Sequence, residues 1–86
     1  MEIDLITVLG LCAAAGTTGA FLPQVIRTAR LKETKDISLA MYIVMLVGIS
    51  LWLVYGILRS DLPVIAANAL TLVLVAAVLG MKIKYG

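Results

Sequence analysis

The chain is only 86 residues long, 63% of its residues are apolar, and its formal net charge is +2. Soluble domains contain roughly 45–50% apolar residues, so a soluble fold of this size could not cover the apolar surface, and there is no length for a second domain. The chain also has no His and a single Cys, and its cations form no extended basic face, so we expect no enzyme activity, no metal or other cofactor, and no nucleic-acid partner.

Three charge-free apolar stretches occupy most of the chain, at residues 5–26, 37–58 and 62–81. A helix rises about 1.5 Å per residue, so 20 or more residues reach roughly 30 Å, the thickness of the hydrocarbon core of a bilayer. The sequence therefore predicts an all-α integral membrane protein with one three-span domain over residues 1–86. Glu2 and Asp4 stand where a secretory signal peptide has basic residues, so we expect the first stretch to be retained as a span.

Positive charges are divided unequally between the two sides of this predicted bundle. Arg59 is the only cation on the side of the N-terminus, and six cations lie on the other side: Arg27, Arg30, Lys32, Lys35, Lys82 and Lys84. The positive-inside rule assigns the richer side to the cytoplasm. We therefore expect a multi-pass protein of the plasma membrane, surrounded by lipid, with its N-terminus outside and its C-terminus in the cytoplasm.

The first stretch contains Pro23 near its cytoplasmic end. Proline lacks the amide hydrogen that would bond the carbonyl of Gly19, so we expect a kink. The hydroxyl of Thr17 or Thr18 is a candidate to bond a carbonyl freed in this way. Proline kinks also serve helix packing alone, and the sequence leaves that alternative open.

The second stretch carries one helical stripe at three- and four-residue steps: Ser38, Met41, Met45, Gly48, Trp52, Tyr55 and Arg59. Trp52 lies seven residues before Arg59, about 10 Å beneath the outer surface. An aromatic-belt role is one interpretation of Trp52, but this depth is large for a headgroup anchor.

The third stretch carries a corresponding stripe: Asp61, Val64, Asn68, Thr71 and Val75. Asn68 lies seven residues after Asp61 and therefore at the same depth as Trp52. A carboxamide facing lipid would leave four hydrogen-bonding positions unpaired, at a cost of several kcal/mol. We expect Asn68 to face protein or water, and polar bonding between helices is the alternative to a binding role.

Trp52 and Asn68 together suit a neutral sugar. A pyranose ring has an apolar C–H face that can lie against an indole, and hydroxyls that a carboxamide can meet as donor and acceptor. No charged residue lies inside any stretch, and intramembrane proton relays and cation sites ordinarily need one. Passive transport by alternating access is the simplest transport mechanism left.

Three helices pack into a solid bundle, so we expect any polar pathway to form between copies. The positive-inside bias makes such a homodimer parallel, with a two-fold axis along the membrane normal. At its outer mouth Arg59 and Asp61, with Tyr55 one turn below, are placed to pair across the opening. A solvated loop ion pair is the competing interpretation.

Residues 21–26, with the sequence Phe-Leu-Pro-Gln-Val-Ile, together with Trp52, Asn68 and the three-span size, resemble the bacterial SemiSWEET sugar transporters, a half-transporter branch of the PQ-loop proteins. The resemblance covers essentially the whole chain. It implies a parallel homodimer of six spans around a central cavity in the bacterial inner membrane, with Trp52 and Asn68 of both copies binding a mono- or disaccharide of the glucose or sucrose type.

The resemblance also implies roles for residues outside that site. Pro23 and Gln24 form the motif at the hinge, and Met41 lies at the inner gate. Tyr55, Arg59 and Asp61 map onto the outer gate. The function expected is a passive sugar uniporter; the alternatives are a non-transporting assembly or regulatory subunit and an ion-coupled small exporter.

Overall fold

A computed structural model describes residues 3–86 and contains three helices within them: α1 (Leu5–Leu31), α2 (Leu39–Leu58) and α3 (Leu62–Tyr85). All three are long and apolar enough to cross a membrane. The expected all-α fold of three membrane-length helices is confirmed. Glu2, on which the expectation for the first stretch partly rests, lies outside the described residues.

Each helix begins at a polar residue whose side chain accepts a backbone hydrogen bond. A carboxylate oxygen of Asp4 accepts from Thr7 N at 2.7 Å, and the same role falls to Ser38 for α2 and to Asp61 for α3. The bond from Thr7 also lowers the pKa of the Asp4 carboxyl below its ordinary value. Such caps satisfy N–H groups that the first helical turn leaves without partners, so the polar residues flanking the apolar stretches fix where the helices start.

The helix α1 continues past the charge-free stretch that ends at Ile26. Arg and Leu residues form helices readily, so the backbone stays helical until Lys32, which takes the left-handed conformation (φ 54°) and donates its N–H to Thr28 O. The basic residues at this end thus extend α1 beyond its apolar part.

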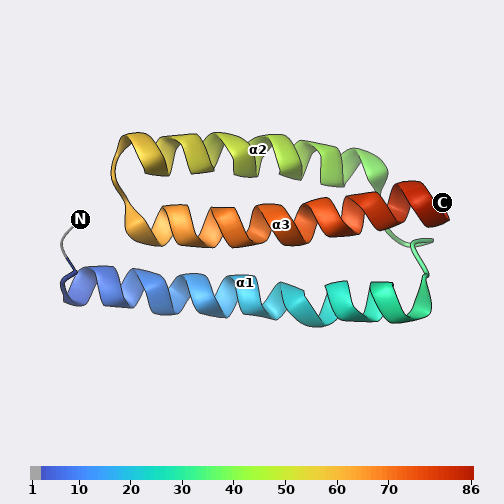
Figure 1. Cartoon of the computed structure of the whole chain (residues 1–86), viewed down its shortest axis with the longest axis horizontal. Helices are drawn as coiled ribbons and strands as arrows, with labels where there is room; N and C mark the ends of the chain where they lie inside the picture. Colours follow the sequence, from blue (N-terminus) through green and yellow to red (C-terminus); the bar gives the residue numbers. More distant parts are fainter. Residues whose placement is uncertain (1–2) are drawn as a thin grey trace.

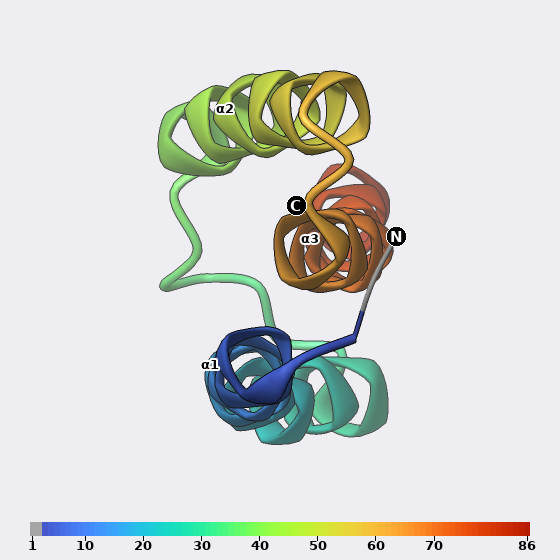
Figure 2. The ribbon, with the colours of Figure 1, turned by 90° about the vertical axis from the view of Figure 1, so that its left-hand side faces the viewer.

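Figure 1 shows the three helices side by side, and α3 lies between α1 and α2. The backbones of α1 and α2 each pack against α3 and do not contact each other, and the end-on view in Figure 2 shows the same order. The connection at residues 59–61 is short, so α2 and α3 are antiparallel neighbours. The longer connection at residues 32–38 carries the chain from α1, past α3, to α2.

The most buried apolar residues lie toward the inner end of the bundle. Val75 and Val78 of α3 are completely buried and Tyr42 of α2 is 2% exposed. The ring of Phe21 from α1 lies 6.3 Å from that of Tyr42, centroid to centroid. Side chains from all three helices therefore meet here, although the backbones of α1 and α2 stay apart.

Two glycines allow α3 to approach its neighbours closely at the outer end. A Cβ on Gly10 of α1 would lie 2.7 Å from Cγ of Pro63, and a Cβ on Gly56 of α2 would lie 2.8 Å from Cγ1 of Val64. Small residues at such contacts let helices pack by van der Waals attraction where lipid supplies no hydrophobic driving force. The outer end is thus held by close backbone approach.

Pro23 lies inside α1, and the two ends of this helix do not share one axis in Figure 2. The expectation that Thr17 or Thr18 bonds a carbonyl freed by Pro23 is wrong. Thr17 Oγ1 donates to Ala13 O at 3.1 Å, and the Thr18 hydroxyl pairs with another helix. The reason is geometric: a helical threonine reaches carbonyls three or four residues before it, whereas Gly19 follows both.

Candidate functional site

Three side chains form a continuous column along the outer half of α2. The ring of Trp52 lies 5.4 Å from that of Tyr55 in an edge-on arrangement (82°), and the guanidinium carbon of Arg59 lies 6.0 Å from the centre of the Tyr55 ring. Both contacts are attractive geometries for aromatic rings and cations. Because the three residues are one turn apart, each fixes the orientation of the next.

This column faces outward from the protomer. Trp52 is 56% exposed and, with Tyr55, Gly48 and Leu51, lines an open depression of about 420 Å³. All of these lining residues come from α2. A tryptophan exposed at this depth presents part of its indole to whatever lies beside the protomer, which is lipid, a solute or a second copy.

Asn68 lies on α3 and is half-buried. Its Nδ2 donates to Val64 O at 2.9 Å, and no side chain or backbone group within residues 3–86 donates to its Oδ1. In the part of the chain that the structure describes, no fully buried side-chain nitrogen or oxygen lacks a partner, so Oδ1 reaches the protomer surface. The amide therefore keeps one acceptor open for a ligand.

Trp52 and Asn68 lie at the same depth on neighbouring helices. Arg59 is the C-cap of α2 and Asp61 is the N-cap of α3. Trp52 lies seven residues before Arg59 and Asn68 lies seven residues after Asp61, so both are about 10 Å from the outer end at 1.5 Å per residue. The structure thereby brings the two predicted sugar contacts to one level of the bundle.

The rest of the polar stripe on α3 is used for packing within the protomer. Val64 contacts Gly56 of α2, Val75 is completely buried, and the hydroxyl of Thr71 lies 3.1 Å from that of Thr18 on α1. Because α3 lies between α1 and α2, residues of this stripe contact both of those helices. Asn68 keeps an open polar atom among these packed residues.

The predicted outer-gate residues gather at one pocket. Tyr55, Arg59 and Asp61 line a pocket of about 560 Å³ that is closed on its other side by the start of α1. Asp61 accepts a hydrogen bond from Val64 N at 3.2 Å, so its carboxylate is held at the start of α3. Arg59 lies over Tyr55, and both the cation of Arg59 and the carboxylate of Asp61 belong to residues that line this pocket.

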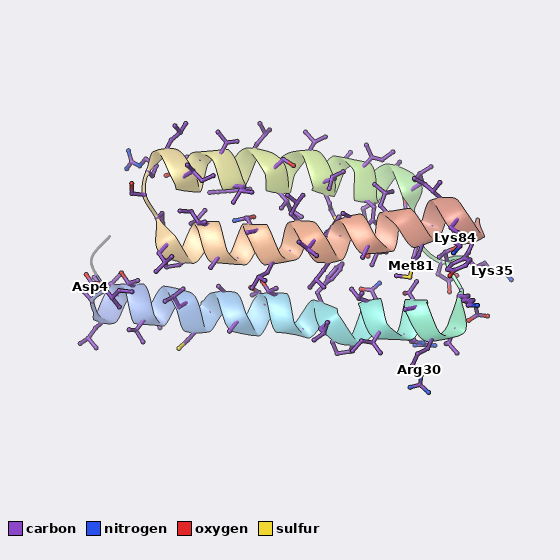
Figure 3. All side chains as sticks on the ribbon, in the orientation of Figure 1. Asp4, Arg30, Lys35, Met81 and Lys84 are labelled. Carbon is purple, nitrogen blue, oxygen red and sulfur yellow. The ribbon has the colours of Figure 1, made fainter. Side chains whose placement is uncertain are left out.

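The predicted hinge and inner-gate residues lie at the other end of the bundle. Pro23 lines a depression of about 440 Å³ on the surface of α1, together with Arg27 and Arg30, and Figure 3 shows Arg30 pointing away from α3. Gln24 lines a separate, smaller pocket beside residues 33–37. Met41, in the first turn of α2, is 52% exposed.

Sequence analysis missed two interactions, one between α1 and α3 and one between α3 and the connection that follows α1. One is the hydroxyl pair of Thr18 and Thr71; the other is a hydrogen bond of 2.9 Å from Lys82 Nζ to Thr34 O. Thr34 is only 3% exposed. The sequence presents Lys82 only as a cytoplasmic charge, and nothing in it marks a backbone carbonyl 48 residues away as the partner of that charge.

Within residues 3–86 no group of three or more His, Cys, Asp or Glu side chains could hold a metal ion. In the same range the Asp, Glu, Lys and Arg side chains lie near the helix ends and in the connections. Trp52 and Asn68 place an indole and an amide in the central part of the bundle.

Comparison with known proteins gives this arrangement a family. Residues 5–65 match the model of the PQ loop repeat. The sugar transporter SemiSWEET of Bradyrhizobium diazoefficiens is 45% identical over 86 residues, which is 100% of both chains. The SemiSWEET of Leptospira biflexa is 53% identical over 78 residues, 91% of this chain and 92% of that one. The chain belongs to the SemiSWEET family.

Solved structures agree with this assignment. A crystal structure of a bacterial homologue of SWEET transporters matches with a TM-score of 0.90 at 44% identity, over 96% of this SemiSWEET chain and 100% of the other. A crystal structure of SemiSWEET in the inward-open conformation gives the same TM-score of 0.90 at 48% identity, over 94% of both chains. The helix order α1–α3–α2 is therefore the arrangement of the family.

Proposed function

We propose that this SemiSWEET chain transports a neutral mono- or disaccharide, of the glucose or sucrose type, passively across a bacterial plasma membrane. The observation that carries the proposal is the half-exposed indole of Trp52 at the same depth as the open amide oxygen of Asn68. The relatives named as sugar transporters, which are not enzymes, support it.

The site is completed by a second copy. The depression at Trp52 is lined by α2 alone, so one protomer does not enclose a solute. In a parallel homodimer, two indoles and two amides face one chamber, and a hexose ring lies against an indole while its hydroxyls bond the carboxamides. Positive charge at the inner end fixes both copies with the N-terminus outside and the C-terminus in the cytoplasm.

Access alternates between the two ends of this chamber. At the outer end Arg59 of one copy pairs with Asp61 of the other beside Tyr55, closing the pocket that these residues line. At the inner end Met41 closes the mouth, and α1 bends at the Pro23-Gln24 motif to open it. The central part of the bundle, within residues 3–86, carries no Asp, Glu, Lys, Arg or His side chain to couple the motion to protons, so the sugar gradient alone sets the direction.

Uptake into proteoliposomes tests this proposal. Radiolabelled glucose and sucrose are offered to purified protein with and without a proton gradient. Trp52→Ala and Asn68→Ala are expected to abolish uptake while the dimer stays assembled, and a proton gradient is expected to give no accumulation. Matched controls are Val44→Ala and Leu70→Ala, which truncate exposed apolar residues of the same two helices away from the site.

Three results would contradict the proposal. Full uptake by both site variants would place the sugar elsewhere. Accumulation driven by a pH jump would favour an ion-coupled exporter. A wild-type protein that is inert in liposomes but co-purifies with a larger membrane complex would favour a regulatory subunit.

A further inference from the structure

One hydrogen bond joins the helix that carries Pro23 to the helix that carries Asn68. The hydroxyls of Thr18 on α1 and Thr71 on α3 lie 3.1 Å apart, and Thr18 is only 8% exposed. Thr71 is one helical turn beyond Asn68 on the same face. Thr18 directly precedes Gly19, whose carbonyl loses its helical partner to Pro23.

The same helix has a second fixed contact with α3 nearer the outer end. The ring of Pro63 comes so close to Gly10 that a Cβ there would lie 2.7 Å from Pro63 Cγ. Gly10 and Thr18 are eight residues apart, so the two contacts hold about two turns of α1 against α3. The outer part of α1 and the helix of Asn68 thus form one body.

The inner part of α1 is held differently. Beyond Gly19 its inward contacts are the packing of Phe21 and Val25 against the cluster of Tyr42, Val75 and Val78, and a polar contact of the Gln24 side chain with Tyr42. The hydroxyl of Thr28 is spent within α1, on Gln24 O at 2.8 Å. The inner part of α1 thus meets α3 only through apolar packing, which tolerates small displacements, whereas the part-buried hydroxyl pair of Thr18 and Thr71 loses its hydrogen bond when α1 moves against α3.

We propose that the Thr18–Thr71 hydrogen bond holds the outer part of α1 against α3. Bending at Pro23 then moves only the inner part of α1, and the outer part keeps its position relative to Asn68. This inference rests on the proposed transport function and assigns Thr18 and Thr71 as positioning residues that do not touch the sugar. Breaking the bond is expected to slow the conformational step and leave sugar affinity unchanged.

The experiment measures turnover and affinity separately. Turnover is taken from exchange of labelled sugar in proteoliposomes, and affinity from the fluorescence of Trp52, the chain's single tryptophan. Thr18→Val and Thr71→Val remove one hydroxyl each at nearly constant shape. Each variant is expected to lower turnover about threefold, the factor that corresponds to about 0.6 kcal/mol for one hydrogen bond between membrane helices. The double variant is expected to lower turnover no more than either single variant does, because both substitutions remove the same bond.

Two controls separate this role from a general loss of packing. Thr17→Val removes the neighbouring hydroxyl, which bonds Ala13 O within α1, and should keep wild-type turnover. Thr18→Ser keeps the hydroxyl and should also keep wild-type turnover. The inference is overturned if the losses of Thr18→Val and Thr71→Val multiply, if Thr17→Val is equally slow, or if affinity falls in step with turnover. Absence of transport in the wild type would instead overturn the proposed function, and this inference with it.

Discussion

The close contact at Gly56 yields a prediction with a magnitude. In Gly56→Ala the new Cβ would lie 2.8 Å from Val64 Cγ1 and 3.2 Å from the backbone nitrogen of Ile65. Real Cβ atoms essentially never come within 3.0 Å of a heavy atom that is not a covalent near neighbour. A rotation of Val64 relieves only the first contact, because the second involves the backbone of α3, so α2 and α3 must move apart.

Overpacking of this kind costs about 1–3 kcal/mol, while alanine in place of glycine inside a helix gains about 1 kcal/mol. The reference variant is Gly80→Ala, because a Cβ at Gly80 meets nothing within 4 Å. This variant therefore has the gain from the higher helix propensity of alanine and no overpacking. Gly56→Ala is therefore expected to be less stable than Gly80→Ala by about 1–3 kcal/mol. Chemical unfolding in detergent micelles, followed by circular dichroism, measures the two free energies of unfolding.

Equal stability of Gly56→Ala and Gly80→Ala would refute this reasoning. It would mean that α2 and α3 are not held at the distance seen between Gly56 and Val64. Gly48→Ala is unsuitable as the reference, because Gly48 lines the depression at Trp52 and its substitution would also alter the sugar site.

Four further predictions follow from single contacts. Pro23→Ala should slow sugar exchange more than it weakens affinity, because it removes the kink and leaves the site intact; unchanged exchange would assign Pro23 to packing. Asp61→Ala should favour the outward-open state, and unaltered labelling of a cysteine introduced in the outer mouth would count against the gate. Lys82→Met keeps the apolar stem but loses the bond to Thr34 O, and should lower the free energy of unfolding by about 1–3 kcal/mol in a denaturant titration; no change would show that the connection is held by other contacts. The bond from Thr7 N lowers the pKa of Asp4 below its ordinary 3.8, so the cap stabilises the fold above pH 3.8 and this stabilisation is lost as the pH falls through the lowered pKa. Asp4→Asn should remove this dependence of the free energy of unfolding on acid pH. Equal pH slopes of the free energy of unfolding in Asp4→Asn and the wild type would contradict the prediction.

The helices themselves could be predicted because membrane insertion depends on properties that are local in sequence. A charge-free run of sufficient length, a polar cap such as Ser38 and a proline at a known position each act within one helix. The matched depth of Trp52 and Asn68 followed from the same arithmetic, since only three residues separate their helices.

Contacts between helices were beyond this reasoning. The hydroxyl pair of Thr18 and Thr71 and the bond from Lys82 to Thr34 O join residues 53 and 48 positions apart. Periodicity predicts that Thr71 shares a face with Asn68, but not that this face meets α1. Thr71 meets α1 because α3 lies between α1 and α2, and the order of the helices is not encoded in the periodicity of one helix.

The fluorescence of Trp52 tests the central claim most directly, because this residue is the only tryptophan in the chain. Purified protein is titrated with glucose and with sucrose, and Asn68→Ala, which keeps the indole, serves as the paired variant. We predict a saturable change in tryptophan emission with the transported sugar and the loss of this change in Asn68→Ala. A protein that carries the sugar into liposomes while its tryptophan emission stays constant would contradict the site.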